Sequence, residues 1–282
     1  MLEILKAVLF GIVEGVTEWL PISSTGHLIL LNEFISLDVS AEFMEMFDVV
    51  IQLGAILAVI VLFFHKLNPF SPGKSEQQKR RTWDLWFKVI VAVLPSAVLG
   101  LLLDDWLDAT LYNSVVVSLM LIVYGVAFLL VERRNAQTKP AITKVHAIDY
   151  KTALYIGAFQ CLSLIPGTSR SGATILGAIL LGVSRSAGAE FSFYLAIPTM
   201  VGASALKAVK FLLSGAQITG LEVGVLLVGC LVSFVVSLLV IRGLMQYVRK
   251  HSFRVFGVYR IVLGMVVLTY FTIQALIGWS AK

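Results

Sequence analysis

Charged side chains are scarce in this sequence: they make up 14% of its 282 residues, whereas hydrophobic residues make up 58%. Soluble globular domains carry roughly 25% charged residues, so the scarcity excludes an ordinary soluble domain. The chain has instead a series of apolar runs of about 18 residues or more, the length that crosses the hydrocarbon core of a bilayer as a helix. We therefore interpret the chain as an all-α polytopic membrane protein.

Cysteine is also rare, and the two cysteines, Cys161 and Cys230, both lie in apolar segments. Small buried hydrophobic side chains are a more ordinary role there than a disulfide or a metal site. No small-residue cleavage site follows the apolar N-terminus, which Glu14 and Glu18 interrupt, so we reject a cleaved signal peptide. The net charge of +5 comes from basic residues in short loops, which membrane topology explains better than nucleic-acid binding.

Six apolar runs have the length of full spans. They cover about residues 46–64, 85–103, 111–131, 191–213, 221–241 and 255–279. Two further regions, about 1–36 and 151–183, are apolar but broken in the middle by Pro, Gly, Ser and Thr. A short apolar piece, a turn and a second short piece are typical of a re-entrant hairpin or a discontinuous helix. The sequence therefore predicts six transmembrane helices and two re-entrant helical hairpins.

Three loops rich in Lys and Arg orient the spans: 65–88, 132–151 and 242–254. The acidic turn at 104–108 holds no basic residue. By the positive-inside rule the basic loops are cytoplasmic and the acidic turn lies outside. Spans 46–64 and 191–213 each follow a broken hairpin but then run in opposite directions, so the two halves of the chain have opposite orientation.

The two broken regions also resemble each other. Residues 11–30 (GIVEGVTEWLPISSTGHLIL) align without a gap with residues 157–176 (GAFQCLSLIPGTSRSGATIL), at an offset of 146. The matches include the turn, where Ser23 corresponds to Ser169. With the inverted flanking topology, this predicts an inverted-topology repeat whose broken helices meet near the bilayer midplane. The halves cover about residues 1–135 and 147–282 of a single membrane domain, 1–282.

The first broken region carries two carboxylates and a histidine. Glu14 and Glu18 lie at i,i+4 on one helix face, and a turn from Pro21 to His27 follows. Ionisable groups are costly at membrane depth and are seldom placed there without a function. Because carboxylates repel phosphate, we expect them to bind a divalent cation that bridges to it, or to handle protons. We interpret His27, beside two carboxylates, as functional.

The second broken region, Pro166 to Thr174, supplies Arg170, several hydroxyl groups and Gly-permitted backbone amides that open a helix. That combination suits a phosphate, because Arg offers a planar fork of donors and a helix N-terminus favours negative charge. Arg170 could also pair with Glu14 or Glu18, and we expect it to do so when the site is empty. The two turns together predict a site for a phosphate-bearing ligand.

Three stretches make the chain resemble the undecaprenyl-diphosphate phosphatase family of the bacitracin-resistance type, over essentially its whole length. They are EGVTEWLPISSTGH (Glu14 to His27), PGTSRSGAT (Pro166 to Thr174) and GVSRSAGAEFSFYLAIP (Gly182 to Pro198). The resemblance implies a hydrolase of the bacterial cytoplasmic membrane that converts undecaprenyl diphosphate to undecaprenyl phosphate and so recycles the lipid carrier of peptidoglycan synthesis. It also implies an effect on bacitracin sensitivity, a need for a divalent cation (Mg²⁺ or Ca²⁺) and a site that opens toward the outer face.

The resemblance further implies that Glu14, Glu18, His27 and Arg170 are critical and that neighbouring serines assist. The expected catalytic residues are therefore Glu14, Glu18, Ser23, Ser24, His27 and Arg170, with Glu14 and Glu18 as metal ligands. The expected phosphate-binding residues are Thr25, Gly26, Gly167, Thr168, Ser169, Ser171, Gly172 and Thr174. The partners expected are the isoprenoid diphosphate substrate and membrane lipid, without nucleic acid, and no oligomeric state is predicted.

The nucleophile is left open between a metal-bound water, a serine (Ser23 or Ser24) and His27. Membrane phosphatases of the lipid-phosphate acid-phosphatase type share a short Ser-Gly-His-like element and use one histidine as nucleophile and a second as acid. Here the predicted membrane core holds only His27. We therefore favour His27 as a proton donor or base, and we rank serine and metal-bound water equally.

Two other functional classes compete with hydrolysis. Inverted repeats with broken helices are also the architecture of secondary transporters, so the fold alone does not exclude a transporter or lipid flippase. Two carboxylates, a histidine and an arginine exceed what binding an anion needs, which favours hydrolysis. An ion channel lacks support, because the sequence has no repeated ring of acidic or carbonyl-rich filter elements.

Overall fold

The computed structural model describes residues 1–278, apart from the side chains of Asp104, Asp108 and Ile277. Within this range the chain forms twelve α-helices, two short 3₁₀ helices and no strand. The α-helices are α1 (Leu2–Thr17), α2 (Ser24–Phe34), α3 (Ala41–Val50), α4 (Gln52–Leu62), α5 (Phe64–Leu67), α6 (Glu76–Leu111), α7 (Ser114–Asn135), α8 (Tyr150–Cys161), α9 (Arg170–Leu180), α10 (Arg185–Leu213), α11 (Gly220–Lys250) and α12 (Arg254–Ile277). The 3₁₀ helices are η1 (Val145–Ala147) and η2 (Leu162–Leu164). The predicted all-α class is confirmed.

Six segments of the described chain are long and apolar enough to cross a membrane, as the sequence predicts. They are Ala41–Leu62, Glu76–Leu103, Ser114–Asn135, Arg185–Leu213, Gly220–Lys250 and Arg254–Leu276. The first of these combines α3 and α4, and each of the others belongs to a single long helix. Residue 279, with which the predicted last span ends, lies outside the described residues.

The prediction of an acidic turn at 104–108 is wrong, because this segment continues α6, which ends only at Leu111. No glycine or proline interrupts the segment, so nothing in it stops the helix. The break comes instead at Asn113, whose Oδ1 accepts the N–H of Val116 at 3.0 Å and caps α7. The side chains of Asp104 and Asp108 lie outside the described part of the chain.

Each broken region forms a helical hairpin: α1 packs against α2, and α8 packs against α9. The turn of each ends in a serine with positive φ, 73° at Ser23 and 74° at Ser169, and within residues 1–278 no other non-glycine residue has a positive φ. Each serine caps the following helix, because its Oγ accepts the N–H of the glycine three residues on, at 3.3 Å and 3.1 Å respectively. The two turns thus share their local geometry at the offset of 146. Re-entry of the hairpins into the bilayer stays a prediction.

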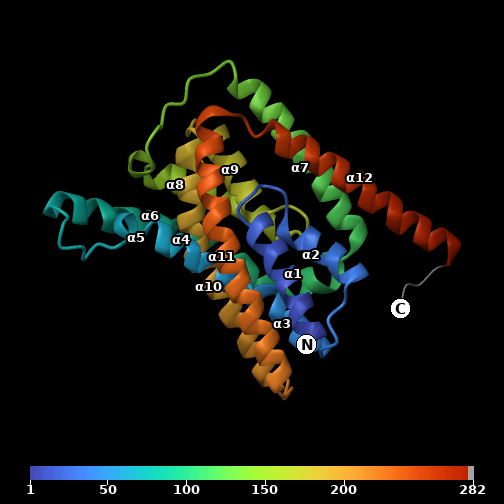
Figure 1. Ribbon diagram of the computed structural model, residues 1–282. Helices are drawn as coiled ribbons and strands as arrows, with labels where there is room; N and C mark the ends of the chain where they lie inside the picture. The colour runs from blue at the N-terminus through green and yellow to red at the C-terminus, as the bar shows by residue number, and fades with distance from the viewer. Residues whose placement is uncertain (279–282) are drawn as a thin grey trace.

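The first helix of each hairpin packs against a long helix from the other half of the chain. Helix α1 packs against α11, α8 packs against α6, and α7 lies beside α12 (Figure 1). At the 146-residue offset, α8 corresponds to α1 and α6 to α11, so each hairpin packs against the long helix of the other half. Glycines permit both contacts: a Cβ at Gly11 would lie 2.6 Å from the Gly229 carbonyl oxygen, and one at Gly157 would lie 2.1 Å from that of Ala92. This packing supports an internal repeat, while its limits at 1–135 and 147–282 stay a prediction.

Candidate functional site

The turns of the two hairpins touch each other, and Ser171 makes the contact. It is the second residue of α9 and is almost completely buried. Its Oγ lies 3.1 Å from the carbonyl oxygen of Glu18 and 3.3 Å from that of Leu20, either of which accepts its proton. The two turns that the sequence analysis assigned to one site therefore lie in direct contact.

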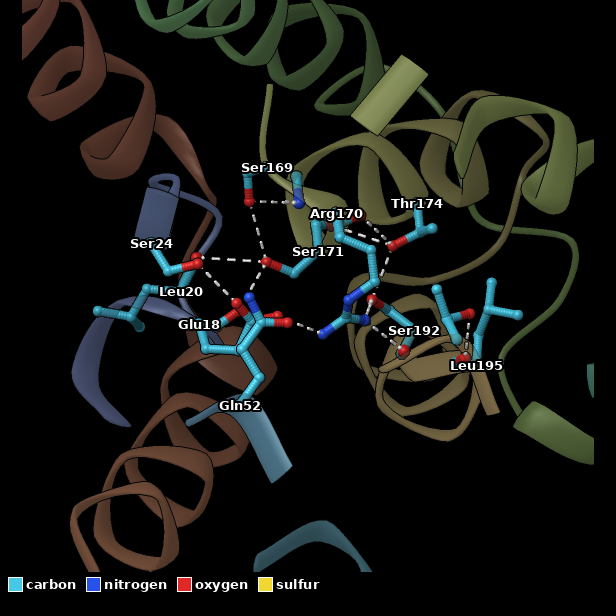
Figure 2. A network of polar contacts seen from close by, with 12 residues as sticks. Glu18, Leu20, Ser24, Gln52, Ser169, Arg170, Ser171, Thr174, Ser192 and Leu195 are labelled. Atoms are coloured by element: carbon cyan, nitrogen blue, oxygen red, sulfur yellow. Dashed lines mark hydrogen bonds and ion pairs between the residues drawn. The ribbon is translucent and has the colours of Figure 1, made fainter. Parts of the chain in front are cut away.

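Glu18 is the centre of the polar group formed at this contact (Figure 2). Its Oε1 accepts a hydrogen bond from Arg170 Nη2 at 2.9 Å, an ion pair in which both side chains are largely buried. Its Oε2 accepts a hydrogen bond from Ser24 Oγ at 2.6 Å. Figure 2 also shows the side chain of Gln52, from the start of α4, pointing toward Glu18. The structure thus contains the pairing of Arg170 with a glutamate that the sequence analysis expects.

Helix α10 holds the other side of the Arg170 guanidinium. Nη1 donates to the carbonyl oxygen of Ser192 at 2.8 Å, and the guanidinium carbon lies 5.8 Å from the centre of the Trp19 ring. Ser192 Oγ lies 2.7 Å from Thr174 Oγ1, which itself donates to the backbone of α9. Sequence reasoning assigned no role to Ser192, although it lies within the third matched stretch. These contacts fix the direction in which Arg170 presents its charge.

Ser23 and Ser24 have different surroundings, although both are buried. Ser23 Oγ accepts the N–H of Gly26 and so serves the cap of α2. Ser24 Oγ instead donates to a carboxylate, which is the arrangement of a hydroxyl nucleophile beside a general base. Of the two serines that the sequence leaves open, the geometry favours Ser24.

Glu14 lies one turn before Glu18 on α1 and is completely buried. Neither of its carboxylate oxygens has a hydrogen-bond partner among the described residues, and the same holds for Asp48 Oδ1. Carboxylate oxygens are preferred ligands of Mg²⁺ and Ca²⁺, so these unpartnered atoms fit a divalent cation.

The described residues contain no group of three or more His, Cys, Asp or Glu side chains that could hold a metal without other ligands. A cation at Glu14 would therefore need oxygens from elsewhere, as Mg²⁺ commonly does when substrate phosphates complete its coordination. Both oxygens of Glu18 are already engaged by Ser24 and Arg170. The prediction that Glu14 and Glu18 bind the metal stays untested by this arrangement.

His27 lies on α2 and contacts α12 rather than the carboxylates. Its Nδ1 is 2.7 Å from the carbonyl oxygen of Ser23, and its Nε2 is 2.7 Å from the hydroxyl of Tyr259. Its ring lies parallel to that of Tyr259, with centroids 5.7 Å apart. A neutral ring that donates from Nδ1 to the carbonyl can accept the tyrosine proton at Nε2. Its role as a proton donor or base stays a prediction.

Arg260, on α12, ties both turns together and was missed by sequence reasoning. It is completely buried. Nη1 donates to the carbonyl oxygen of Pro21 in the first turn at 3.1 Å, while Nη2 lies 2.8 Å from that of Gly167 and 2.9 Å from that of Thr168 in the second. A lone arginine inside an apolar span could have marked this position as functionally or structurally important, because such a charge is costly at membrane depth.

The start of α9 and the start of α2 both face this meeting point of the turns, so each brings the unpaired amides of a first helical turn to it. Helix N-termini favour anions. Gly172 and Gly26 have their amides capped by the serines before them, and the carbonyl of Gly167 is held by Arg260. Thr25 has no hydrogen bond from its side chain among the described residues and is half-buried. Phosphate binding by these predicted residues stays a prediction.

Residues 7–266 match the family described as bacitracin resistance protein BacA. An undecaprenyl-diphosphatase of Streptococcus thermophilus is 58% identical over 278 residues, which cover 99% of this chain and 96% of the relative. An undecaprenyl-diphosphatase of Lactiplantibacillus plantarum is 59% identical, and the match covers 97% of this chain and 99% of the relative. An undecaprenyl-diphosphatase of Enterococcus faecalis is also 59% identical, and the match covers 94% of this chain and 96% of the relative. The chain therefore belongs to the bacitracin resistance protein BacA family.

Proposed function

We propose that this protein hydrolyses undecaprenyl diphosphate to undecaprenyl phosphate and inorganic phosphate, and thereby recycles the lipid carrier of peptidoglycan synthesis. The names of relatives that match nearly its whole length support this activity, and the family supports a part in bacitracin resistance. The observation that carries the proposal is Glu18, which contacts a serine hydroxyl with one oxygen and an arginine with the other.

In the proposed first step, Ser24 Oγ attacks the terminal phosphorus while Glu18 Oε2 takes the hydroxyl proton. The bond from phosphorus to the bridging oxygen breaks, and Glu18 passes that proton to the departing undecaprenyl phosphate, which leaves the carboxylate ionised again. Water then attacks the phosphoserine while Glu18 takes a water proton and passes it to Ser24 Oγ, which releases phosphate and restores the Ser24 hydroxyl. The 2.6 Å contact between the two side chains supports this assignment over Ser23, which caps α2.

Protonation of Glu18 has a second consequence for Arg170. A neutral carboxyl no longer holds the guanidinium as an ion pair, so the Nη2 group becomes available to the transferring phosphoryl group. Phosphoryl transfer depends mainly on positioning and on neutralising charge. Arg170, anchored from α10 by the Ser192 carbonyl, and the amides at the start of α9 would provide both.

A divalent cation, Mg²⁺ or Ca²⁺, is part of the proposal. The unpartnered oxygens of Glu14 and Asp48 are protein groups that would hold it, with Glu18 as the further ligand that the sequence predicts. When bound, such an ion would supply further neutralisation of the diphosphate charge.

We further propose that the protein resides in the bacterial cytoplasmic membrane, with the site open to the outer face. Six apolar helices support a multi-pass membrane protein. By the positive-inside rule, the basic loops support an orientation in which their end of the bundle lies in the cytoplasm.

Trapping the intermediate tests the proposed nucleophile. Rapid quench of the purified protein during turnover of undecaprenyl diphosphate should give a phosphopeptide that carries its phosphate on Ser24. Ser24→Ala should abolish both the adduct and phosphate release, whereas Ser23→Ala, the matched neighbour, should keep the adduct. Rapid phosphate release without any phosphorylated serine or histidine would instead identify water as the nucleophile.

A further inference from the structure

A cavity of about 350 Å³ lies between α5, the first turns of α6, η1 and the start of α10. Its charged and imidazole groups are His65, Lys66, Lys74, Arg81, His146 and Glu190. The cavity lies beyond the end of the Ala41–Leu62 span and at the start of Glu76–Leu103, on the predicted cytoplasmic side. It shares no residue with the site around Glu18 and has no part in the hydrolysis proposed above.

The cavity holds a built-in positive charge. Lys74 Nζ donates to the carbonyl oxygens of Lys66 and Asn68 and to Thr82 Oγ1, so all three of its protons are used and its charge is fixed in place. Lys66 pairs with Glu190 at 2.7 Å. With Arg81, the lining therefore carries three cations against one carboxylate when both histidines are neutral.

Two further donors of the cavity, Arg81 and His146, are exposed at its mouth. Among the described residues, neither makes a side-chain hydrogen bond or ion pair, so both can donate to a ligand. An arginine fork is suited to a phosphate, because a phosphate accepts several charge-assisted hydrogen bonds at once, and the fixed charge of Lys74 adds attraction for an anion. The donors come from α6 and η1, segments far apart in the sequence, so the fold gathers them into one place.

The surroundings of the cavity match the headgroup region of a membrane. Phe64, Phe70, Trp83 and Phe87 all belong to the α5–α6 region and expose between 44% and 75% of their surface. Aromatic side chains collect at membrane–water interfaces, and basic pockets on the cytoplasmic side bind phosphate-bearing headgroups. We propose that this basic cavity binds a phosphate-bearing anion, either an anionic lipid headgroup or free phosphate.

Two binding measurements on the full-length protein test the proposal and separate the sources. The first is native mass spectrometry with phosphatidylglycerol, with phosphatidylcholine as the neutral competitor. The second is the thermal unfolding midpoint in sodium phosphate against sodium chloride at equal ionic strength. Each compares Arg81→Ala with Arg80→Ala, which removes the same charge from the neighbouring exposed residue outside the cavity.

We expect Arg81→Ala to weaken binding by about tenfold, the equivalent of one charge-assisted hydrogen bond, and Arg80→Ala to leave it unchanged. A difference with phosphatidylglycerol identifies a lipid headgroup, and a difference only with sodium phosphate identifies the free anion. Should Arg81→Ala not fold, His146→Ala gives the same comparison. Equal behaviour of the cavity variants and Arg80→Ala toward both probes would overturn the proposal.

Discussion

At the scale of single residues, Arg170 serves two acceptors in turn: the Glu18 carboxylate at rest and, by the proposed mechanism, the phosphate during turnover. A lysine keeps the charge but lacks the planar fork that reaches Glu18 and the Ser192 carbonyl from two nitrogens. We therefore predict that Arg170→Lys lowers kcat by about a hundredfold, as loss of one transition-state donor does. Steady-state phosphate release measures the effect, and near-normal kcat in this variant would remove Arg170 from the transition state.

Arg260 should matter for stability, because its guanidinium satisfies backbone carbonyls in both turns. Arg260→Met leaves those buried acceptors without donors. We predict a loss of about 3 kcal/mol or more in unfolding free energy, from several charged hydrogen bonds. Arg254→Met, an exposed change on the same helix, is the control. Thermal unfolding in detergent should separate the two variants, and equal midpoints would show that Arg260 does not hold the turns.

Part of the site could be predicted from residue chemistry alone. The pairing of Arg170 with a glutamate follows from the cost of unpaired charges at membrane depth. The partner of His27 could not be predicted, because Tyr259 lies more than two hundred residues away in the chain. The role of Ser192 was missed for the same reason, because it depends on how α10 packs. Arg260 could have been noticed as an arginine inside an apolar span, but the carbonyl groups that it binds could not be predicted.

At the scale of helices, glycines let the first helix of each hairpin pack closely against the long helix of the other half of the chain. A Cβ at Gly157 would lie 2.1 Å from the carbonyl oxygen of Ala92, a backbone atom that has little freedom to move. Gly157→Ala should therefore force α8 away from α6 and cost about 1–3 kcal/mol.

The matched control is Gly243→Ala on α11, where a Cβ meets no atom within 4 Å. There the change should stabilise the helix by about 0.5–1 kcal/mol, because alanine has less backbone freedom to lose. Both effects appear in the thermal unfolding midpoint. A neutral or stabilising Gly157→Ala would contradict the packing of α8 against α6.

Helix positions could be predicted largely from the sequence, because long apolar runs and Pro-Ser-Gly breaks act locally. The end of α6 could not, since acidic residues at 104–108 suggest a turn by charge while their backbone continues the helix to Leu111. The sequence pattern also does not predict which helices pack together. The contacts of α1 with α11 and of α8 with α6 bring glycines close to the backbone of a helix that is distant in the sequence.

At the scale of the whole molecule, the positive-inside rule predicts which end of the bundle faces the cytoplasm. Single cysteines test it in a chain whose Cys161 and Cys230 have been replaced by alanine. A membrane-impermeant thiol reagent applied to intact cells should label Ala109→Cys, which is exposed near the end of α6, and should not label Lys139→Cys in the basic loop. The reverse labelling would invert the proposed topology and the side on which the site opens.

The central claim is that the contact between the two turns, built on Glu18, is the hydrolytic site. Phosphate release from undecaprenyl diphosphate by the purified protein tests it most directly, with Mg²⁺, with Ca²⁺ and with a chelator. Glu18→Gln keeps the size and polarity of the side chain but removes the base and the ion pair with Arg170. We predict metal-dependent release by the unaltered protein and none by folded Glu18→Gln, whereas full release by that variant would contradict the account.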